Sequence, residues 1–435
     1  MLKRAILALM LATLFLPAEA MSGTISLPQT GQTTSYAAGD DGALKIGVAW
    51  PNPRFTANAN QTVTDNLTGL IWAKDAGTPT VGSCTGGTKP WQAALDYVAC
   101  LNTANYLGYN DWRLPNINEL ESLVHDGLTD IVAWPNSQGF ANVQYWGYWS
   151  STTYASATSN AWLVGVCGSY VNYGPKSISL CYVVPVRSGQ SGSVGISAIW
   201  STGQTTTYAT GDDGALKKGV AWPNPRFTDN SNNTVTDNLT GLVWAKDAGT
   251  PTVGSIVSFF MCTGGTKTWQ AALNYVACLN AYNYLGYRDW RLPNRKELSS
   301  LVDRGRYTSS IPSGHPFSNL QSSDYWSSTT YASVTSNAWL IDMSDGYVYS
   351  DDDKTSSHYV WPVRGGQYGA STIPMQISYW DEYNNFVKDN VGNMSETSEG
   401  LRYNGYGYRS NAMLLSKSTF NFIGSETYIN MEGAW

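Results

Sequence analysis

Six basic side chains gather between positions 288 and 306, where they could hold an anionic ligand. They are Arg288, Arg291, Arg295, Lys296, Arg304 and Arg306. An arginine fork binds sulfate or carboxylate through two parallel N–H bonds, and a helix beginning after Asn294 would add backbone donors. Because Asp289, Glu297 and Asp303 stand among these residues, a neutralised and solvated helix face is the alternative. The cluster predicts a site for an anionic glycan.

A second group of side chains has the chemistry of a calcium site. Five aspartates flank the segment 346–349, namely Asp342, Asp345, Asp351, Asp352 and Asp353. Clustered carboxylates on a loop supply the oxygen ligands that Ca²⁺ prefers. Their spacing is not that of an EF-hand loop, so a solvated acidic loop is the alternative. Calcium is the one cofactor that the sequence suggests.

The chain repeats itself, so its two halves can be compared position by position. The segment that begins at Gly31 returns at Gly203, and both halves contain DWRLPN and WSSTTYAS. This period is as long as a whole domain and far exceeds that of solenoid repeats. The basic cluster is specific to the second copy, since the first copy has instead Asn110, Ile117, Asn118, Asp126 and Leu128. We therefore expect two domains with a shared framework and different functions.

The cysteines predict three disulfides. Two of the pairs share one spacing and one place in the copies, whereas Cys167 and Cys181 occur in the first copy alone. Their counterparts, Ser344 and His358, both lack a thiol, which is the pattern that loss of a bonded pair leaves. In an exported protein disulfides are the natural interpretation, with free buried thiols or a metal site as alternatives. The predicted pairs are Cys84–Cys100, Cys167–Cys181 and Cys262–Cys278.

Two helices and a group of short strands must position these residues in each copy. Residues 91–101 have their apolar side chains at helical spacing, and Asn116 with Glu119 is close to a capping box for a second helix. Strands are expected at 148–154, 161–166 and 182–187, after a hairpin over 54–64. Helices followed by strands indicate an α+β domain with a twisted antiparallel core.

The shared motifs are interpreted mainly as framework. The Trp-Arg pair of DWRLPN, at 112–113 and 290–291, could form a ligand platform, since an indole face can stack on a sugar or hold a cation. We prefer a buried corner in which the arginine bonds carbonyl groups and the proline opens a helix. The segment 149–154 is interpreted as a core strand, and the aspartate pairs 40–41 and 212–213 as caps of turns.

Composition divides the chain into five parts. Residues 1–20 have the basic start, apolar run and small-residue end of a secretory signal peptide. The two copies are assigned to 29–190 and 202–367, with a Gly/Ser-rich linker over 191–201. The remaining segment, 368–435, is aromatic and Gly-rich, has no counterpart and stays unassigned. The protein is thus expected to be secreted, periplasmic or at the cell surface.

Charge and motifs exclude several classes of function. The net charge of −6 argues against nucleic acid as a partner, and no stretch after the leader is apolar enough to cross a membrane. The histidines do not recur between the copies, and GxSxG, HExxH and phosphate-binding loops are absent from the sequence. Carboxylate pairs for glycoside hydrolysis depend on distance in space and stay open. We expect a protein that is not an enzyme.

Several motifs together resemble a known family. TVTDNLTGLIWAKDAG, WQAALDYVACLN, DWRLPNINELESLV, YWSSTTYAS and YVWPVRGGQ are similar to the C-terminal domain family of the Legionella collagen-like adhesin (Lcl). The resemblance implies trimerisation and binding of sulfated glycosaminoglycans through basic surface residues. The order of motifs is also similar to that of the formylglycine-generating-enzyme group, which implies a C-type-lectin-like fold. The catalytic cysteines of that group are not evident here.

These observations predict an exported binding protein, adhesin-like or lectin-like, made of two tandem C-type-lectin-like α+β domains. Its expected ligand is an extracellular polysaccharide or another ligand on a host or cell surface. A structural protein that assembles with its own copies as a homo-oligomer is the first alternative. A glycan-processing enzyme is the second.

Overall fold

Both copies of the repeat fold into one unit of the computed structural model. This unit is Met1–Ser371, and Thr372–Trp435 form another. The residues described are 25–129, 132–165, 170–177, 181–188, 197–255, 260–350, 352–365, 379–380, 386–387, 394–397 and 400–403. The predicted signal peptide lies outside them.

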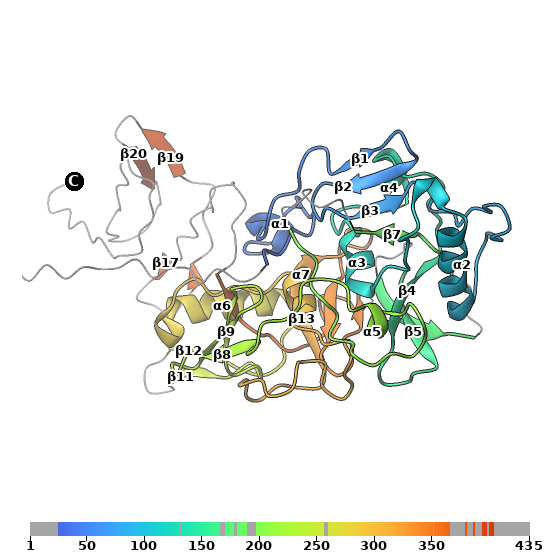
Figure 1. The fold of residues 1–435 in the computed structure, drawn as a ribbon. Coiled ribbons are helices and arrows are strands. Elements are labelled where there is room, and N and C mark those ends of the chain that lie inside the picture. The colour runs from blue at the N-terminus through green and yellow to red at the C-terminus, as the bar shows by residue number, and fades with distance from the viewer. Residues whose placement is uncertain are drawn as a thin grey trace, which may run out of the picture. The chain divides into compact units, whose positions relative to one another are not determined.

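The elements of the two copies follow the same order (Figure 1), apart from one short helix found in the first copy and two short strands found in the second. The helices of the first copy are α1 (Asp41–Leu44), α2 (Trp91–Thr103), the 3₁₀ turn η1 (Tyr106–Gly108), α3 (Ile117–Ser122) and α4 (Ala133–Ser137). Its strands are β1 (Phe55–Ala57), β2 (Thr62–Asp65), β3 (Ile71–Ala73), β4 (Gly147–Thr153), β5 (Asn160–Gly165), β6 (Tyr170–Pro175) and β7 (Val186–Arg187). The helices of the second copy are α5 (Asp213–Leu216), α6 (Trp269–Ala281), η3 (Tyr284–Gly286) and α7 (Arg295–Ser300). Its strands are β8 (Phe227–Asp229), β9 (Thr234–Asp237), β10 (Val243–Ala245), β11 (Val253–Ser255), β12 (Phe260–Cys262), β13 (Asp324–Thr330), β14 (Ala338–Asp342), β15 (Val348–Tyr349) and β16 (Val363–Arg364).

The long helix of each copy forms where the sequence predicts it. α2 buries the apolar face that runs from Trp91 to Leu101, and α6 buries the same face in the second copy. Each helix is tied to the segment before it by a disulfide, Cys84–Cys100 or Cys262–Cys278. Two of the predicted disulfides are therefore confirmed.

The short helices α3 and α7 begin at capping boxes. The Asn116 side chain accepts a hydrogen bond from the Glu119 N–H, and the Glu119 carboxylate accepts one from the Asn116 N–H, both at 2.9 Å. Asn294 and Glu297 repeat this arrangement in α7. A capping box satisfies N–H groups that have no partner within the helix. The predicted start of the second helix is confirmed in both copies.

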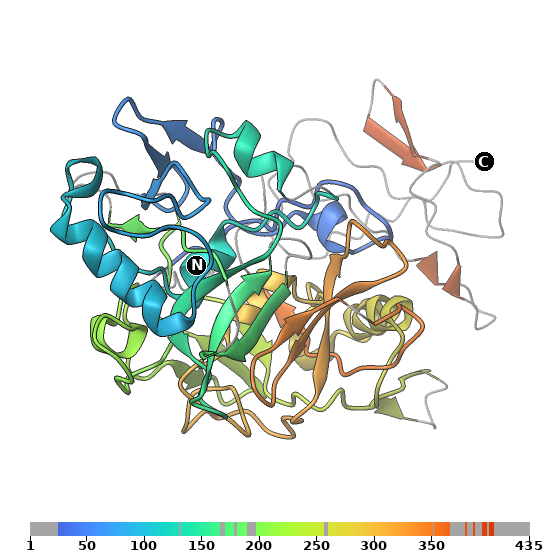
Figure 2. The same ribbon diagram turned by 90° about the vertical axis from the view of Figure 1, so that its right-hand side faces the viewer.

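A six-stranded sheet joins the two copies. Its order is β13-β14-β15-β6-β5-β4, so three strands come from each copy, as the green and orange strands of Figure 2 show. Within this sheet, β6 of the first copy pairs with β15 of the second through Val171 and Val348, which occupy equivalent positions. Smaller sheets, β1-β2-β3-β7 and β16-β10-β9-β8, belong to one copy each. The described part of the chain is therefore α+β with antiparallel sheets, as predicted.

The segment that precedes the first hairpin of each copy crosses to the other copy. The Gln32 side chain donates to the Thr330 carbonyl at 2.7 Å and accepts from the Thr330 N–H at 3.0 Å. Gln204 makes the same pair of bonds with Thr153, at 2.8 and 3.0 Å. Because the exchange is reciprocal, the copies meet like the subunits of a two-fold symmetric dimer, through the same patch on each.

Two expectations about the chain path change in the structure. Of the linker predicted over 191–201, residues 197–201 are described, and Ser197 is buried with its N–H donating to the Leu67 carbonyl of the first copy. The strand expected over 182–187 is reduced to β7, because Pro185 has no N–H to donate to a ladder.

The second unit is described only through four short strands. β17 (Tyr379–Trp380) pairs with β18 (Phe386–Val387), and β19 (Met394–Thr397) pairs with β20 (Gly400–Tyr403). Both pairs are antiparallel.

Candidate functional site

The predicted basic cluster does not form one exposed face. Its buried members, each at most 5 % exposed, are Arg291, Arg295, Lys296 and Arg304. A buried cation that is already paired cannot also hold a ligand from solution, so the prediction is corrected for these four. Arg288 is exposed and Arg306 is half-buried, and ligand binding by them stays a prediction.

Arg291 belongs to the buried corner of DWRLPN. Its guanidinium donates two hydrogen bonds of 2.6 Å to the Glu297 carboxylate, and Arg113 binds Glu119 in the same way at 2.5 Å. The carboxylate that completes the capping box is thus also the partner of the arginine. The corner is buried as predicted, but the main bond goes to a carboxylate rather than to carbonyl groups.

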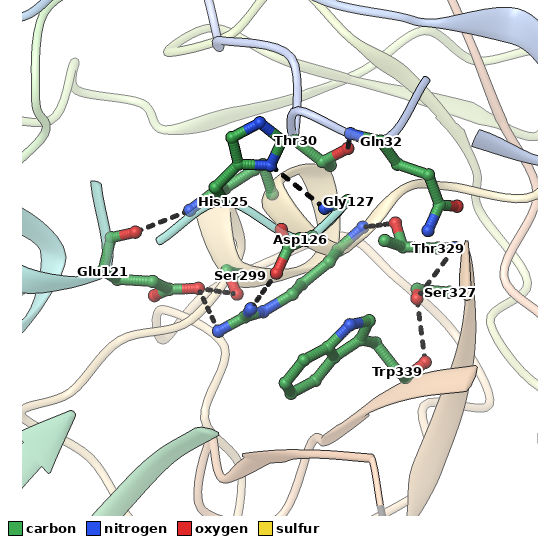
Figure 3. Close-up of polar contacts among 12 residues, drawn as sticks. Thr30, Gln32, Glu121, His125, Asp126, Gly127, Ser299, Ser327, Thr329 and Trp339 are labelled. Carbon is green, nitrogen blue, oxygen red and sulfur yellow. Dashed lines mark hydrogen bonds and ion pairs between the residues drawn. The ribbon is translucent and has the colours of Figure 1, made fainter. Parts of the chain in front are cut away.

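Arg295 is fully buried among side chains of both copies. Figure 3 shows Glu121 and Asp126 of the first copy beside Ser299 of the second. The Arg295 guanidinium forms an ion pair with Asp126 of the first copy, and its Nη2 lies 3.6 Å from the Glu121 carboxylate. The same guanidinium lies 4.0 Å from the ring of Trp339, within the range of a cation–π contact. The side chains of Arg295 and Asp126 are 0 % exposed.

Glu121 is the second carboxylate that the first copy supplies to this buried cluster. Lys296 donates to the Glu121 carbonyl at 2.7 Å, and the Ser299 hydroxyl donates to its carboxylate at 3.0 Å. Burial alone would raise the pKa of Glu121, but Lys296, Arg295 and Arg304 together hold it below its usual value. The carboxylate is therefore ionised, and the basic residues of the second copy neutralise the acidic residues of the first.

A symmetric pair of aspartates lies at the same boundary. Asp41 accepts hydrogen bonds from the hydroxyls of Thr30, at 2.6 Å, and Thr329 of the other copy, at 2.7 Å. Asp213 is held in the same way by Thr202 and Thr152. Burial raises the pKa of each carboxyl to about 7.

The two aspartates of each pair therefore have different roles. Asp40 and Asp212 cap α1 and α5, as predicted. Asp41 and Asp213 instead join the copies.

The predicted calcium ligands serve separate partners. Asp345 accepts from the Tyr154 hydroxyl of the first copy at 2.8 Å, and Asp352 lies 2.7 Å from His358. Asp342 and Asp353 accept backbone N–H groups within their own turns, and Asp351 lies outside the described residues. Within the ranges that the structure describes, no group of three or more acidic, His or Cys side chains could hold a metal ion. Binding of calcium stays a prediction.

The third predicted disulfide is not formed. Cys181 carries a free, buried thiol, and Cys167 lies outside the described residues. The Cys181 backbone is fixed against Lys89 by hydrogen bonds of 3.0 and 3.3 Å, and its side chain belongs to the apolar cluster that packs on α2. The joint loss of both cysteines from the second copy was therefore a misleading sign of a bond.

Alkylation should distinguish the free thiol from a disulfide. Native protein treated with iodoacetamide at pH 8 is expected to keep Cys181 unmodified, because burial raises the pKa of this thiol to about 12. After unfolding without reductant, Cys181 should react, while the cysteines bonded in the two confirmed disulfides should not. Peptide mass spectrometry measures both results. Recovery of Cys181 joined to Cys167 under these conditions would reinstate the original prediction.

An exposed aromatic pair marks the surface of the first copy. Tyr145 is 65 % exposed and Trp146 is 72 % exposed, whereas their counterparts in the second copy are Ser322 and Ser323. The charged differences between the copies give no indication of this pair. Comparing the same loop in the two copies would have found it.

The loop that carries the pair is anchored at its base. The Gln144 N–H donates to the Tyr148 hydroxyl at 2.8 Å, and the Asn142 side chain donates to Asp75 at 2.9 Å. Gln321 and Asn319 make equivalent bonds in the second copy. The framework of the loop is thus shared, and the side chains at its tip differ.

Comparison with known families and proteins adds one finding. The family model described as the Lcl C-terminal domain matches residues 61–187 and again residues 233–364. No curated protein matches the chain in the corresponding comparison. Among the helices of the described residues, none has the length and apolar character needed to cross a membrane.

Proposed function

This chain belongs to the Lcl C-terminal domain family, with two tandem copies of the domain, and we propose that it is an exported ligand-binding protein of the adhesin or lectin type. The proposal includes export to the periplasm, the cell surface or the medium. It assigns no catalytic activity to the chain. It also keeps the C-type-lectin-like fold as an interpretation of the domain.

The observation that carries the proposal is the exposure of Tyr145 and Trp146 on an anchored loop. Large aromatic side chains are normally placed where part of their surface is covered, and adjacent exposed ones mark an interaction site. Covering a large apolar side chain contributes roughly 1.5–3 kcal/mol. Tyr and Trp also carry a polar tip, so they suit the mixed apolar and hydroxylated faces of a sugar.

The electrostatics favour a neutral polysaccharide over a sulfated one. Four of the six basic residues that could have held sulfate are buried, three of them in ion pairs with carboxylates and Lys296 on the Glu121 carbonyl. The chain as a whole has a net charge of −6. Binding through the aromatic pair would therefore be expected to change little with salt, because it uses no exposed ion pair.

A glycan array tests the proposal with a variant that the chain itself suggests. Changing Tyr145→Ser and Trp146→Ser together reproduces the second copy at this loop, and binding should weaken at least tenfold. Tyr307→Thr is the matched control, because Tyr307 is 56 % exposed in the second copy and its counterpart is Thr129. Titration calorimetry on one positive glycan, at two salt concentrations and with EDTA, measures the effect and checks for calcium.

Other results would contradict the proposal. Equal binding by the wild type and the double serine variant would remove the aromatic pair from the site. Association that depends on protein concentration and is lost in the same variant would favour self-assembly. Release of sugar products during the titration would favour the glycan-processing alternative.

A further inference from the structure

The first copy contains an apolar cavity of about 60 Å³. Its walls come from five elements, which contribute Phe55 of β1, Leu120 of α3, Trp134 of α4, Tyr148 of β4 and Val164 of β5. Trp134 and its neighbour Pro135 are half-buried, so the wall formed by α4 borders on solvent. None of the wall residues is Tyr145 or Trp146, so the cavity is distinct from the proposed aromatic binding site.

The second copy fills the corresponding space. Three valines of the wall have larger counterparts there, Val143 becoming Leu320, Val164 becoming Ile341 and Val184 becoming Trp361. The Trp361 side chain is 0 % exposed. Its ring lies 4.7 Å from that of Phe317 and 5.7 Å from that of Tyr325, the residues equivalent to Phe140 and Tyr148. Where the first copy has Val184 in the cavity wall, the second copy therefore has a buried indole.

The cavity in the first copy suits an apolar group rather than water. Three of its wall side chains have polar atoms, namely His125, Trp134 and Tyr148. The Tyr148 hydroxyl already donates to the Ala76 carbonyl at 2.9 Å and accepts from Gln144 at 2.8 Å. A buried water needs two to four polar partners, whereas cavities lined by apolar side chains stay dry and bind apolar molecules.

His125 does not introduce a charge into the wall. Its Nδ1 accepts from the Gly127 N–H at 3.2 Å, and its ring packs edge-on against Trp50 and Trp134 at 4.7 and 4.9 Å. Burial, aided by the neighbouring Arg54, lowers the pKa of His125 to about 4. The imidazole is neutral near pH 7 and leaves the cavity apolar.

We propose that this cavity is a binding site for the short branched alkyl end of a ligand, specific to the first copy. The volume of the cavity limits the ligand to a small alkyl group. A cavity that holds benzene has about 150 Å³, whereas this one has about 60 Å³, which is too small for an aromatic ring. The half-buried wall at α4 allows the rest of the ligand to remain at the surface. The second copy cannot take the same group, since Trp361 occupies its place.

Xenon and two small alcohols test the site on the full chain. Crystals under xenon pressure are expected to show one xenon atom beside Val184, and nuclear magnetic resonance titration should show saturable binding of isobutanol to the same residues. Val184→Trp, which copies the second domain, should abolish both. Trp361→Val should open a second site and raise the number of bound xenon atoms from one to two.

A smaller substitution tests the same wall even if Val184→Trp folds poorly. Val164→Ile is a smaller change that also copies the second domain, and it should weaken isobutanol binding while leaving the melting temperature close to that of the wild type. Absence of saturable binding to the wild type would overturn the proposal. So would unchanged binding in a folded Val184→Trp protein, or tighter binding of benzyl alcohol than of isobutanol.

Discussion

Replacing Arg295 by isoleucine, the residue at the equivalent position 117, is expected to lower the free energy of unfolding by about 3–5 kcal/mol. Asp126 is 0 % exposed and has Arg295 as its ion-pair partner. Burial already raises the pKa of Asp126, and a buried carboxyl that loses its ion-pair partner costs much more than the pair itself contributes. Lys296 remains nearby, but it already donates to the Glu121 carbonyl.

Urea unfolding followed by circular dichroism and tryptophan fluorescence measures this effect. Both signals are needed, because two joined domains need not unfold in a single step. Arg288→Asn is the matched control, since it also gives a residue of the first copy, Asn110, at an exposed member of the cluster. Its effect should stay within about 0.5 kcal/mol.

A double variant separates the lost charge from lost packing. Changing Arg295→Ile together with Asp126→Leu removes both charges, and most of the stability should return, because apolar side chains of similar volume can replace a buried ion pair. An Arg295→Ile protein as stable as the Arg288→Asn control would show that the ion pair does not hold the copies together.

The features predicted correctly from the sequence are those whose causes are local. The apolar face of α2 and the Asn116–Glu119 capping box depend on residues within a few positions of one another. Burial of Arg295 depends on Asp126, which lies 169 positions away in the other copy. Comparison of the copies identified both positions as different, but it could not show that they face each other.

The two-fold arrangement explains why these positions diverged. In a symmetric dimer a residue on the axis meets its own equivalent, as Val171 meets Val348. Glu121 likewise meets Ser299, which occupies its place in α7. Glutamate in both copies would bring two buried carboxylates together, and like charges in low dielectric repel strongly. Duplication within one chain allowed the second copy to carry Ser299 and cations instead.

The surface differences have a separate physical basis. The first copy has Tyr145 and Trp146 where the second has serines, yet the hydrogen bonds at the base of the loop are the same in both copies. Val184 and Trp361 both fit an apolar interior, and the choice between them decides whether a cavity remains. Sequence alone shows such substitutions but not which of them reach solvent. The structure separates those that join the copies from those on the surface or in a cavity wall.

Stability should fall as the pH rises from about 5 to about 7, because of Asp41 and Asp213. Burial raises the pKa of each carboxyl from its ordinary value of 3.8 to about 7 in the folded protein. Their contribution is therefore complete below about pH 4, is lost progressively up to about pH 7 and is absent above it. For each carboxyl, the free energy of unfolding decreases by at most about 1.4 kcal/mol per pH unit. Ionisation of the two carboxyls would weaken the contact between the copies.

Other titratable groups also change the stability with pH, in both directions. The effect of Asp41 and Asp213 must therefore be separated from theirs by substitution. Asp126 and Glu297 raise the pKa of Asp41 further, and Glu119 and Asp212 do the same for Asp213. His125 opposes the trend, because its lowered pKa makes the folded state less stable in acid. The informative quantity is the difference between the wild type and a variant in which only Asp41 and Asp213 no longer titrate.

Asp41→Asn with Asp213→Asn provides that variant, since asparagine resembles the protonated carboxyl and can still accept from the threonine hydroxyls. Its melting temperature should fall less than that of the wild type between pH 5 and pH 8, and the two proteins should differ most at pH 8. Asp96→Asn is the control, because Asp96 is exposed and its counterpart is Asn274. Parallel pH profiles for the wild type and the double variant would mean that these carboxyls are ionised in the fold. The contact between the copies would then be independent of their protonation.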